Sequence, residues 1–130
     1  LQRLNFTYVN TIYSNGDYGE GGFREFKRFL KLIHLNDEER KSRGARICIA
    51  DEQRLRRDVT VQEIRSIFET MIDRLGSDVQ VRVYVLFVTK EDARKLLQAI
   101  KLFNGTHRPV LIASDAWVTT NAFFFFFFFI

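Results

Sequence analysis

The fold is decided by the stretch Val79–Trp117, which reads VQVRVYVLFV, TKEDARKLLQAIKLFN, GTHRP, VLIA and SDAW in succession. The first run is rich in β-branched and aromatic residues and contains no breaker, which is typical of a strand. The second run places apolar residues at helical spacing, and a polar turn then leads into a second apolar strand. Strand, helix and strand in this order predict one βαβ unit, with parallel strands and a right-handed crossover.

The two strands of this unit should end at the same edge of the sheet, because parallel strands share one direction. In open parallel sheets, ligands bind outside the carboxyl ends of the strands. Thr89 and Lys90 follow the first strand, and Ser114 and Asp115 follow the second. We therefore expect these two pairs side by side at a rim that can receive a ligand.

Four further elements precede this unit. Residues 5–14 favour a strand that ends in a turn at Asn15–Asp17, and apolar spacing from Phe23 to Ile33 predicts a helix after the glycine-rich loop. Residues 36–44 are polar and are expected to form a loop or a frayed helix end, before a short strand at residues 46–51. With the next helix, the order β-α-β-α-β-α-β predicts an α/β domain with a parallel sheet and helices on its faces.

The helix expected from Thr60 to Leu75 carries its own start signal. Thr60 followed by Glu63 forms a capping box, in which the two side chains satisfy backbone N–H groups of the first turn. Its apolar stripe consists of Ile64, Ile67, Phe68, Met71, Ile72 and Leu75. A stripe at this spacing is typical of a helix face that packs in the core.

Composition restricts the classes of function. The chain has 130 residues, which fit a single domain or part of one, and a net charge of +4. Basic side chains cluster from Arg40 to Arg57 without interleaved aromatics, so a solvated surface is favoured over a nucleic-acid interface. The single cysteine, Cys48, excludes an internal disulfide framework. The apolar run at residues 123–130 is shorter than the roughly 20 residues that a membrane-spanning helix needs.

Patterns of enzyme and cofactor sites are not found. The glycine-rich segment Gly16–Gly22 lies between a strand and a helix, but it fits neither G-x-G-x-x-G nor the P-loop. His34 and His107 have no partner at metal-ligand spacing. No serine stands in a nucleophile elbow, and Cys48 has no identifiable histidine partner. We therefore expect no enzyme activity, no metal and no cofactor.

A binding role fits the rim better. Tyr18 follows the first strand, Thr89 and Lys90 follow the third, and Asp115 follows the fourth. An aromatic ring with a hydroxyl, together with a carboxylate, suits a small cationic amine. Each residue also has a structural interpretation, since Asp115 could cap a helix, Tyr18 could pack under its loop and Lys90 could be solvated. The residues alone leave the two interpretations balanced.

Four ordered blocks of the sequence resemble a known family. They are YVNTIYSNGDYGEGG (8–22), ARICIA (45–50), VLFVTKEDARKLLQA (85–99) and VLIASDAW (110–117). They resemble the glutamate-binding ectodomain of metabotropic glutamate receptors, which are class C G-protein-coupled receptors. The resemblance implies that residues 1–117 form part of the second lobe of a bilobed domain, a three-layer α/β lobe of periplasmic-binding-protein type.

The resemblance also implies roles at the rim. Tyr18 matches a tyrosine that contacts the bound amino acid, which is expected to be L-glutamate or a relative. Asp115 matches the carboxylate that pairs with the α-amino group of the ligand. Thr89 and Lys90 fall among residues that tune ligand selectivity.

The same resemblance implies the setting of the parent protein. Cys48 matches a cysteine that bonds to a cysteine-rich stalk, and the Asn-x-Thr triplets at Asn5 and Asn104 fit an extracellular glycoprotein. The parent is expected to be a homodimer in the cell membrane, with this lobe outside the cell. A first lobe, the stalk and a seven-helix domain would be supplied by sequence outside this chain, and no nucleic-acid partner is expected.

Residues 118–130 fall outside the pattern. We interpret the homopolymer Phe123–Phe129 as an artefact of gene prediction, which together with the missing initiator methionine suggests a fragment.

Two alternatives to the receptor remain open. One is a soluble flavodoxin-like or periplasmic-type α/β binding module, which a phosphate or cofactor against Gly16–Gly22 would favour. The other is a mis-predicted product without a function of its own.

Overall fold

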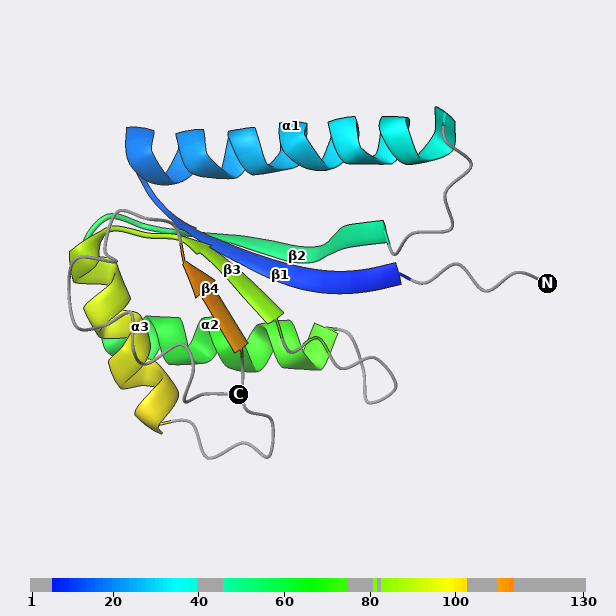
Figure 1. Cartoon of the computed structure of the whole chain (residues 1–130). Helices are drawn as coiled ribbons and strands as arrows, with labels where there is room; N and C mark the ends of the chain where they lie inside the picture. The colour runs from blue at the N-terminus through cyan, green and yellow to red at the C-terminus, as the bar shows by residue number, and fades with distance from the viewer. Residues whose placement is uncertain (1–5, 40–45, 75–80, 82, 103–109, 114–130) are drawn as a thin grey trace.

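The computed structural model describes residues 6–39, 46–74, 81, 83–102 and 110–113, and these residues form four strands and three helices (Figure 1). In chain order the elements are β1 (Phe6–Ser14), α1 (Asp17–Glu39), β2 (Arg46–Leu55), α2 (Val61–Arg74), β3 (Val83–Phe87), α3 (Lys90–Leu102) and β4 (Val110–Ala113). The predicted alternation of strands and helices is confirmed. The α/β fold class is confirmed with it.

The four strands form one parallel sheet in the order β2-β1-β3-β4. Figure 1 shows α1 over one face of this sheet and α2 and α3 under the other. Right-handed crossovers explain this division, because the step from β1 to β2 crosses the sheet in one direction and the steps to β3 and β4 cross it in the opposite direction. The helices after β1 and β3 therefore leave toward opposite faces, and the sheet has a switch point between these two strands.

The main core lies between the sheet and the pair α2 and α3. Alternate strand residues point into it, including Ile12 of β1 and Leu86 of β3, both fully buried. The helices contribute Ile64, Phe68 and Met71 from α2 and Ala93, Leu96 and Ala99 from α3. The predicted core role of the α2 stripe is confirmed for these three residues.

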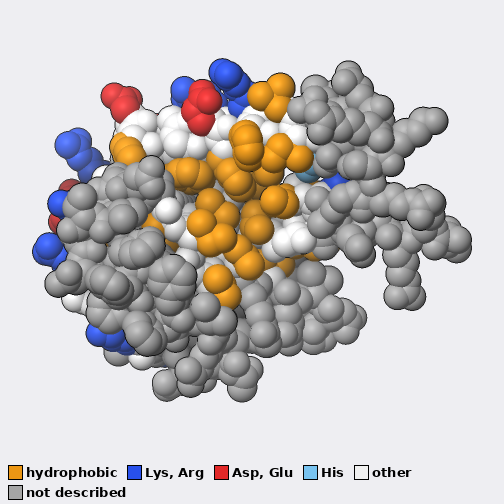
Figure 2. Space-filling model, viewed as in Figure 1, with side chains coloured by type: hydrophobic (Ala, Val, Ile, Leu, Met, Phe, Trp, Pro, Cys, Tyr) orange, Lys and Arg blue, Asp and Glu red, His pale blue; other side chains and the backbone are white. Residues whose placement is uncertain are grey.

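The opposite face carries the single helix α1. Phe23 stacks on Tyr13 of β1 with ring centroids 4.5 Å apart, and the ring of Phe26 lies 5.7 Å from that of Phe87 on β3. A four-stranded sheet is about 19 Å wide and a helix about 10 Å across, so α1 cannot cover the whole face. Ile112 of β4 accordingly remains 51% exposed, and Figure 2 shows hydrophobic side chains gathered beneath α1.

The extents of α1 and β2 differ from the sequence-based prediction. α1 begins at Asp17 and runs to Glu39, so it includes the glycines expected in a loop and part of the polar segment 36–44. The first turn of this helix packs on β1, where a side chain at Gly19 would collide with Ser14, so this position requires glycine. β2 continues to Leu55 instead of ending at residue 51, because it keeps pairing with β1 beyond a register shift at Ala50, as far as the pair Ser14 and Leu55.

Candidate functional site

The carboxyl ends of β1 and β3 meet at one edge of the sheet. Tyr13 of β1 pairs with Phe87 of β3 near the ends of both strands. The turn after β1 contains only Asn15 and Gly16, whose positive φ of 113° favours glycine. Tyr18 follows in the first turn of α1 and is 40% exposed. The first loop therefore presents an aromatic ring at the switch point of the sheet.

Thr89 and Lys90 follow β3 at the same edge, and both side chains are exposed. The Oγ1 atom of Thr89 accepts the N–H of Asp92 at 3.3 Å, so Thr89 caps α3 as well as standing at the rim. Lys90 is the first residue of that helix. The structure thus brings Tyr18, Thr89 and Lys90 to one edge, as the sequence predicted for the loops that carry them.

Sequence reasoning missed Ser14 and Asp92, which lie beneath this rim. Ser14 ends β1 and is 1% exposed. Its hydroxyl donates to Asp92 Oδ2 at 2.6 Å and accepts the N–H of Thr89 at 3.0 Å. The pattern Thr89-x-x-Asp92 is a capping signal that could have revealed the helix start. No local pattern could have revealed Ser14, because 75 and 78 positions separate it from its partners.

The end of β2 is bonded to the turn after β1 and to the start of α1. The N–H of Asn15 donates to the carbonyl oxygen of Leu55 at 3.1 Å. Arg54 Nη1 lies 3.1 Å from Glu20 Oε1, which joins the end of β2 to α1 through an ion pair. The turn before α1 and the first turn of that helix, which carries Tyr18, are therefore both held by the end of β2.

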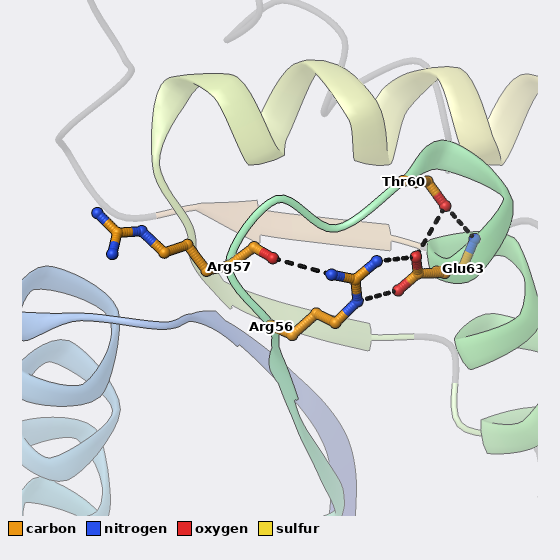
Figure 3. Close-up of polar contacts among 4 residues, drawn as sticks. All are labelled: Arg56, Arg57, Thr60 and Glu63. Carbon is orange, nitrogen blue, oxygen red and sulfur yellow. Dashed lines mark hydrogen bonds and ion pairs between the residues drawn. The ribbon is translucent and has the colours of Figure 1, made fainter.

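The predicted capping box of α2 is confirmed (Figure 3). Thr60 Oγ1 accepts the N–H of Glu63 at 3.2 Å and lies 3.2 Å from Glu63 Oε1, to which it donates. Arg56 binds the Glu63 carboxylate in a bidentate way: its Nε donates to Oε2 at 2.6 Å, and its Nη2 donates to Oε1. Arg57 accepts a hydrogen bond from Arg56 only through its carbonyl oxygen, and Figure 3 shows its side chain pointing away from Glu63. Two of the clustered arginines, Arg54 and Arg56, are thus paired with carboxylates.

The Arg56–Glu63 contact makes the stability depend on pH. Hydrogen bonding to Arg56 holds the pKa of Glu63 below its usual 4.5. Ionised Glu63 therefore stabilises the fold above that value, and the stabilisation is lost as the pH falls through the lowered pKa. We expect wild-type protein to lose more stability between pH 7 and pH 3 than Glu63→Gln, measured by urea unfolding. The difference should be small because the pair is exposed, and it should shrink in 1 M NaCl. Equal losses at low salt would contradict this effect.

The remaining predicted site residues do not belong to the described rim. Asn5, Asn104 and Asp115 lie outside the described residues. Cys48 is a half-buried free thiol on the edge strand β2. It stands seven residues before Leu55, which places it about 23 Å from the rim along the strand. Cys48 is therefore remote from the candidate ligand site.

Other kinds of site find little support in the described part of the chain. There, no group of three or more His, Cys, Asp and Glu residues is placed to hold a metal ion. Likewise, none of the helices described above is long and apolar enough to cross a membrane. The Gly16–Gly22 segment forms a short turn and a helix start, and Asp17 and Glu20 in that first turn oppose the binding of a phosphate. This geometry disfavours the nucleotide-binding alternative.

The sequence is similar to receptor proteins. Residues 1–122 match the family described as "Receptor family ligand binding region". The chain is 34% identical over 117 residues to the metabotropic glutamate receptor of Drosophila melanogaster, and 31% identical over 114 residues to metabotropic glutamate receptor 8 of Homo sapiens. These matches cover 90% and 88% of this chain but 10% and 11% of the two relatives. The chain thus spans about one tenth of the length of the curated relatives it matches.

Proposed function

This chain belongs to the receptor family ligand binding region, and on that basis we propose that it forms part of the second lobe of an extracellular amino-acid-binding domain. The ligand, L-glutamate or a related amino acid, lies between this lobe and a first lobe outside this chain. One observation carries the proposal. Tyr18 and the pair Thr89 and Lys90 follow the carboxyl ends of neighbouring strands at the switch point, where open parallel sheets bind ligands. The parallel sheet with helices on both faces agrees with a lobe of periplasmic-binding-protein type.

Each rim residue has a role in this proposal. The exposed ring of Tyr18 attracts the ammonium group of the ligand through a cation–π contact, and Asp115 pairs with the same group. Thr89 accepts a backbone hydrogen bond, which leaves its hydroxyl proton for the ligand. A cation at a helix N-terminus is unfavourable for the helix, so the position of Lys90 is better explained by an acidic group of the ligand.

The parent protein is proposed to be a membrane receptor rather than an enzyme. Closure of the two lobes around the ligand favours one arrangement of a receptor dimer, which carries the signal to a seven-helix domain. Cys48, remote from the ligand rim, is proposed to bond to a cysteine-rich stalk, and Asn5 and Asn104 to carry glycans. Residues 118–130, including Phe123–Phe129, are proposed to lie outside the lobe.

Calorimetric titration with L-glutamate tests the proposal in two proteins. The 130-residue chain should bind weakly or not at all, because one half of the site is missing. A chimera of the Drosophila relative, in which the matching segment is replaced by the aligned residues of this chain, should bind. In that chimera Tyr18→Ala should weaken binding about tenfold, because the cation–π contact is lost. Tyr18→Phe keeps the ring and serves as the matched control.

Two results would count against this function. Tight glutamate binding by the 130-residue chain alone would contradict the two-lobe arrangement. If the Tyr18→Ala chimera binds glutamate with unchanged affinity, Tyr18 does not contact the ligand.

A further inference from the structure

The first turns of α2 and α3 are capped in different ways. In α2 the box closes on itself, since Thr60 and Glu63 bond to one another. In α3 the equivalent residues are Thr89 and Asp92, and the Ser14 hydroxyl of β1 stands between them. It accepts the N–H of Thr89 at 3.0 Å and donates to Asp92 Oδ2 at 2.6 Å. A residue of the central sheet thus completes the cap of a helix that begins 76 positions later.

We propose that Ser14 is a positioning residue that couples the starts of α1 and α3, and so fixes Tyr18 relative to Thr89 and Lys90. For ligand binding the proposal rests on the function argued above. The coupling itself involves only residues of this chain and needs no ligand.

The hydroxyl of Ser14 has no simple substitute. Its one proton and one of its lone pairs are both used, and the side chain is buried, so water cannot replace it. Its bond to the Asp92 carboxylate is short and charge-assisted, which makes it one of the stronger kinds of hydrogen bond. Removing the hydroxyl leaves the Thr89 N–H and the carboxylate without this partner, which loosens the first turn of α3.

The backbone of the same residue supports α1. A Cβ built at Gly19 would lie 2.1 Å from the carbonyl oxygen of Ser14, so the first turn of α1 rests directly on this peptide group. That turn closes with the hydrogen bond from the Glu20 N–H to the Gly16 carbonyl oxygen at 3.0 Å. Ser14 therefore holds α3 through its side chain and α1 through its main chain. Displacing its peptide group moves both helix starts.

Amide hydrogen exchange, followed by NMR in the 130-residue chain, tests the coupling. The reporters are the N–H groups of Thr89, of Ala93, which bonds to the Thr89 carbonyl oxygen, and of Glu20; the internal reference is Ile64, which bonds to the Thr60 carbonyl oxygen. Ser14→Ala should speed exchange of Thr89 about tenfold relative to Ile64, because a buried hydrogen bond is lost. Exchange of Ala93 and Glu20 should also become several-fold faster relative to Ile64.

Two further variants separate coupling from general destabilisation. Ser14→Thr keeps the hydroxyl and should restore the ratios. Thr60→Ala removes the cap of α2. It should speed the amide exchange of Ile64 without changing the ratio of the Glu20 exchange rate to the Thr89 exchange rate. If Ser14→Ala does not fold, Asp92→Ala replaces it, because it removes the acceptor from a partly exposed position. An unchanged ratio of Glu20 to Ile64 in the variant that folds would overturn the coupling.

The ligand arm uses the chimera described above and L-glutamate as the probe. Ser14→Ala should weaken binding about three- to tenfold, because the two loops are no longer preorganised, and Ser14→Thr should recover most of the loss. Unchanged affinity in Ser14→Ala would overturn the positioning role in binding. A chimera that fails to bind glutamate at all counts against the proposed function alone, since the exchange ratios are measured without ligand.

Discussion

Gly19→Ala is expected to destabilise the fold by about 3 kcal/mol or more. The added Cβ would lie 2.1 Å from the carbonyl oxygen, 2.7 Å from the nitrogen and 2.8 Å from the carbonyl carbon of Ser14. All three atoms belong to the backbone of the central strand β1, which is paired on both sides and cannot move away. The steric clash can therefore be relieved only if the start of α1, which carries Tyr18, moves away from the sheet.

Urea unfolding followed by circular dichroism measures this loss, with Gly21→Ala as the matched control. A Cβ at Gly21 meets nothing within 4 Å, although the residue lies two positions away in the same helix. The control should be stabilised by about 0.5–1 kcal/mol, because glycine is a poor helix former. If Gly19→Ala is as stable as Gly21→Ala, the first turn of α1 does not pack against Ser14 as described.

Leu86→Ala is expected to cost about 2–5 kcal/mol, the range for a leucine deleted from a packed core. Leu86 is fully buried in β3 and belongs to the core cluster against α2 and α3. The small domain cannot fill the resulting cavity without moving a helix. The free energy of urea unfolding at pH 7 gives the loss.

Leu32→Ala makes the same chemical change on the outer surface of α1, where the side chain is 51% exposed. It should change the stability by about 0.5 kcal/mol or less, because little buried area is removed. Similar losses in the two variants would mean that the sheet is not packed on α2 and α3 in the manner described.

Several features of this protein could be predicted from local sequence alone. The unbroken β-branched and aromatic run of β3 and the apolar spacing of α2 and α3 were sufficient for their types and order, because both signals lie in neighbouring residues. The α2 cap was equally accessible, since Thr60 and Glu63 are three positions apart. The parallel pairing of β3 with β4 followed from the strand-helix-strand order of this stretch.

Tertiary structure decided the rest of the candidate site. The glycines after Gly16 were expected in a loop, but they lie in α1, whose first turn packs at Gly19 against the Ser14 peptide. The double role of Thr89, at the rim and in the cap of α3, depends on a strand that ends 75 positions earlier. The sequence by itself therefore determined the elements and the edge of the sheet that bears the loops. Which residues hold those loops together was decided by contacts between distant segments, because such contacts leave no periodic pattern or motif along the chain.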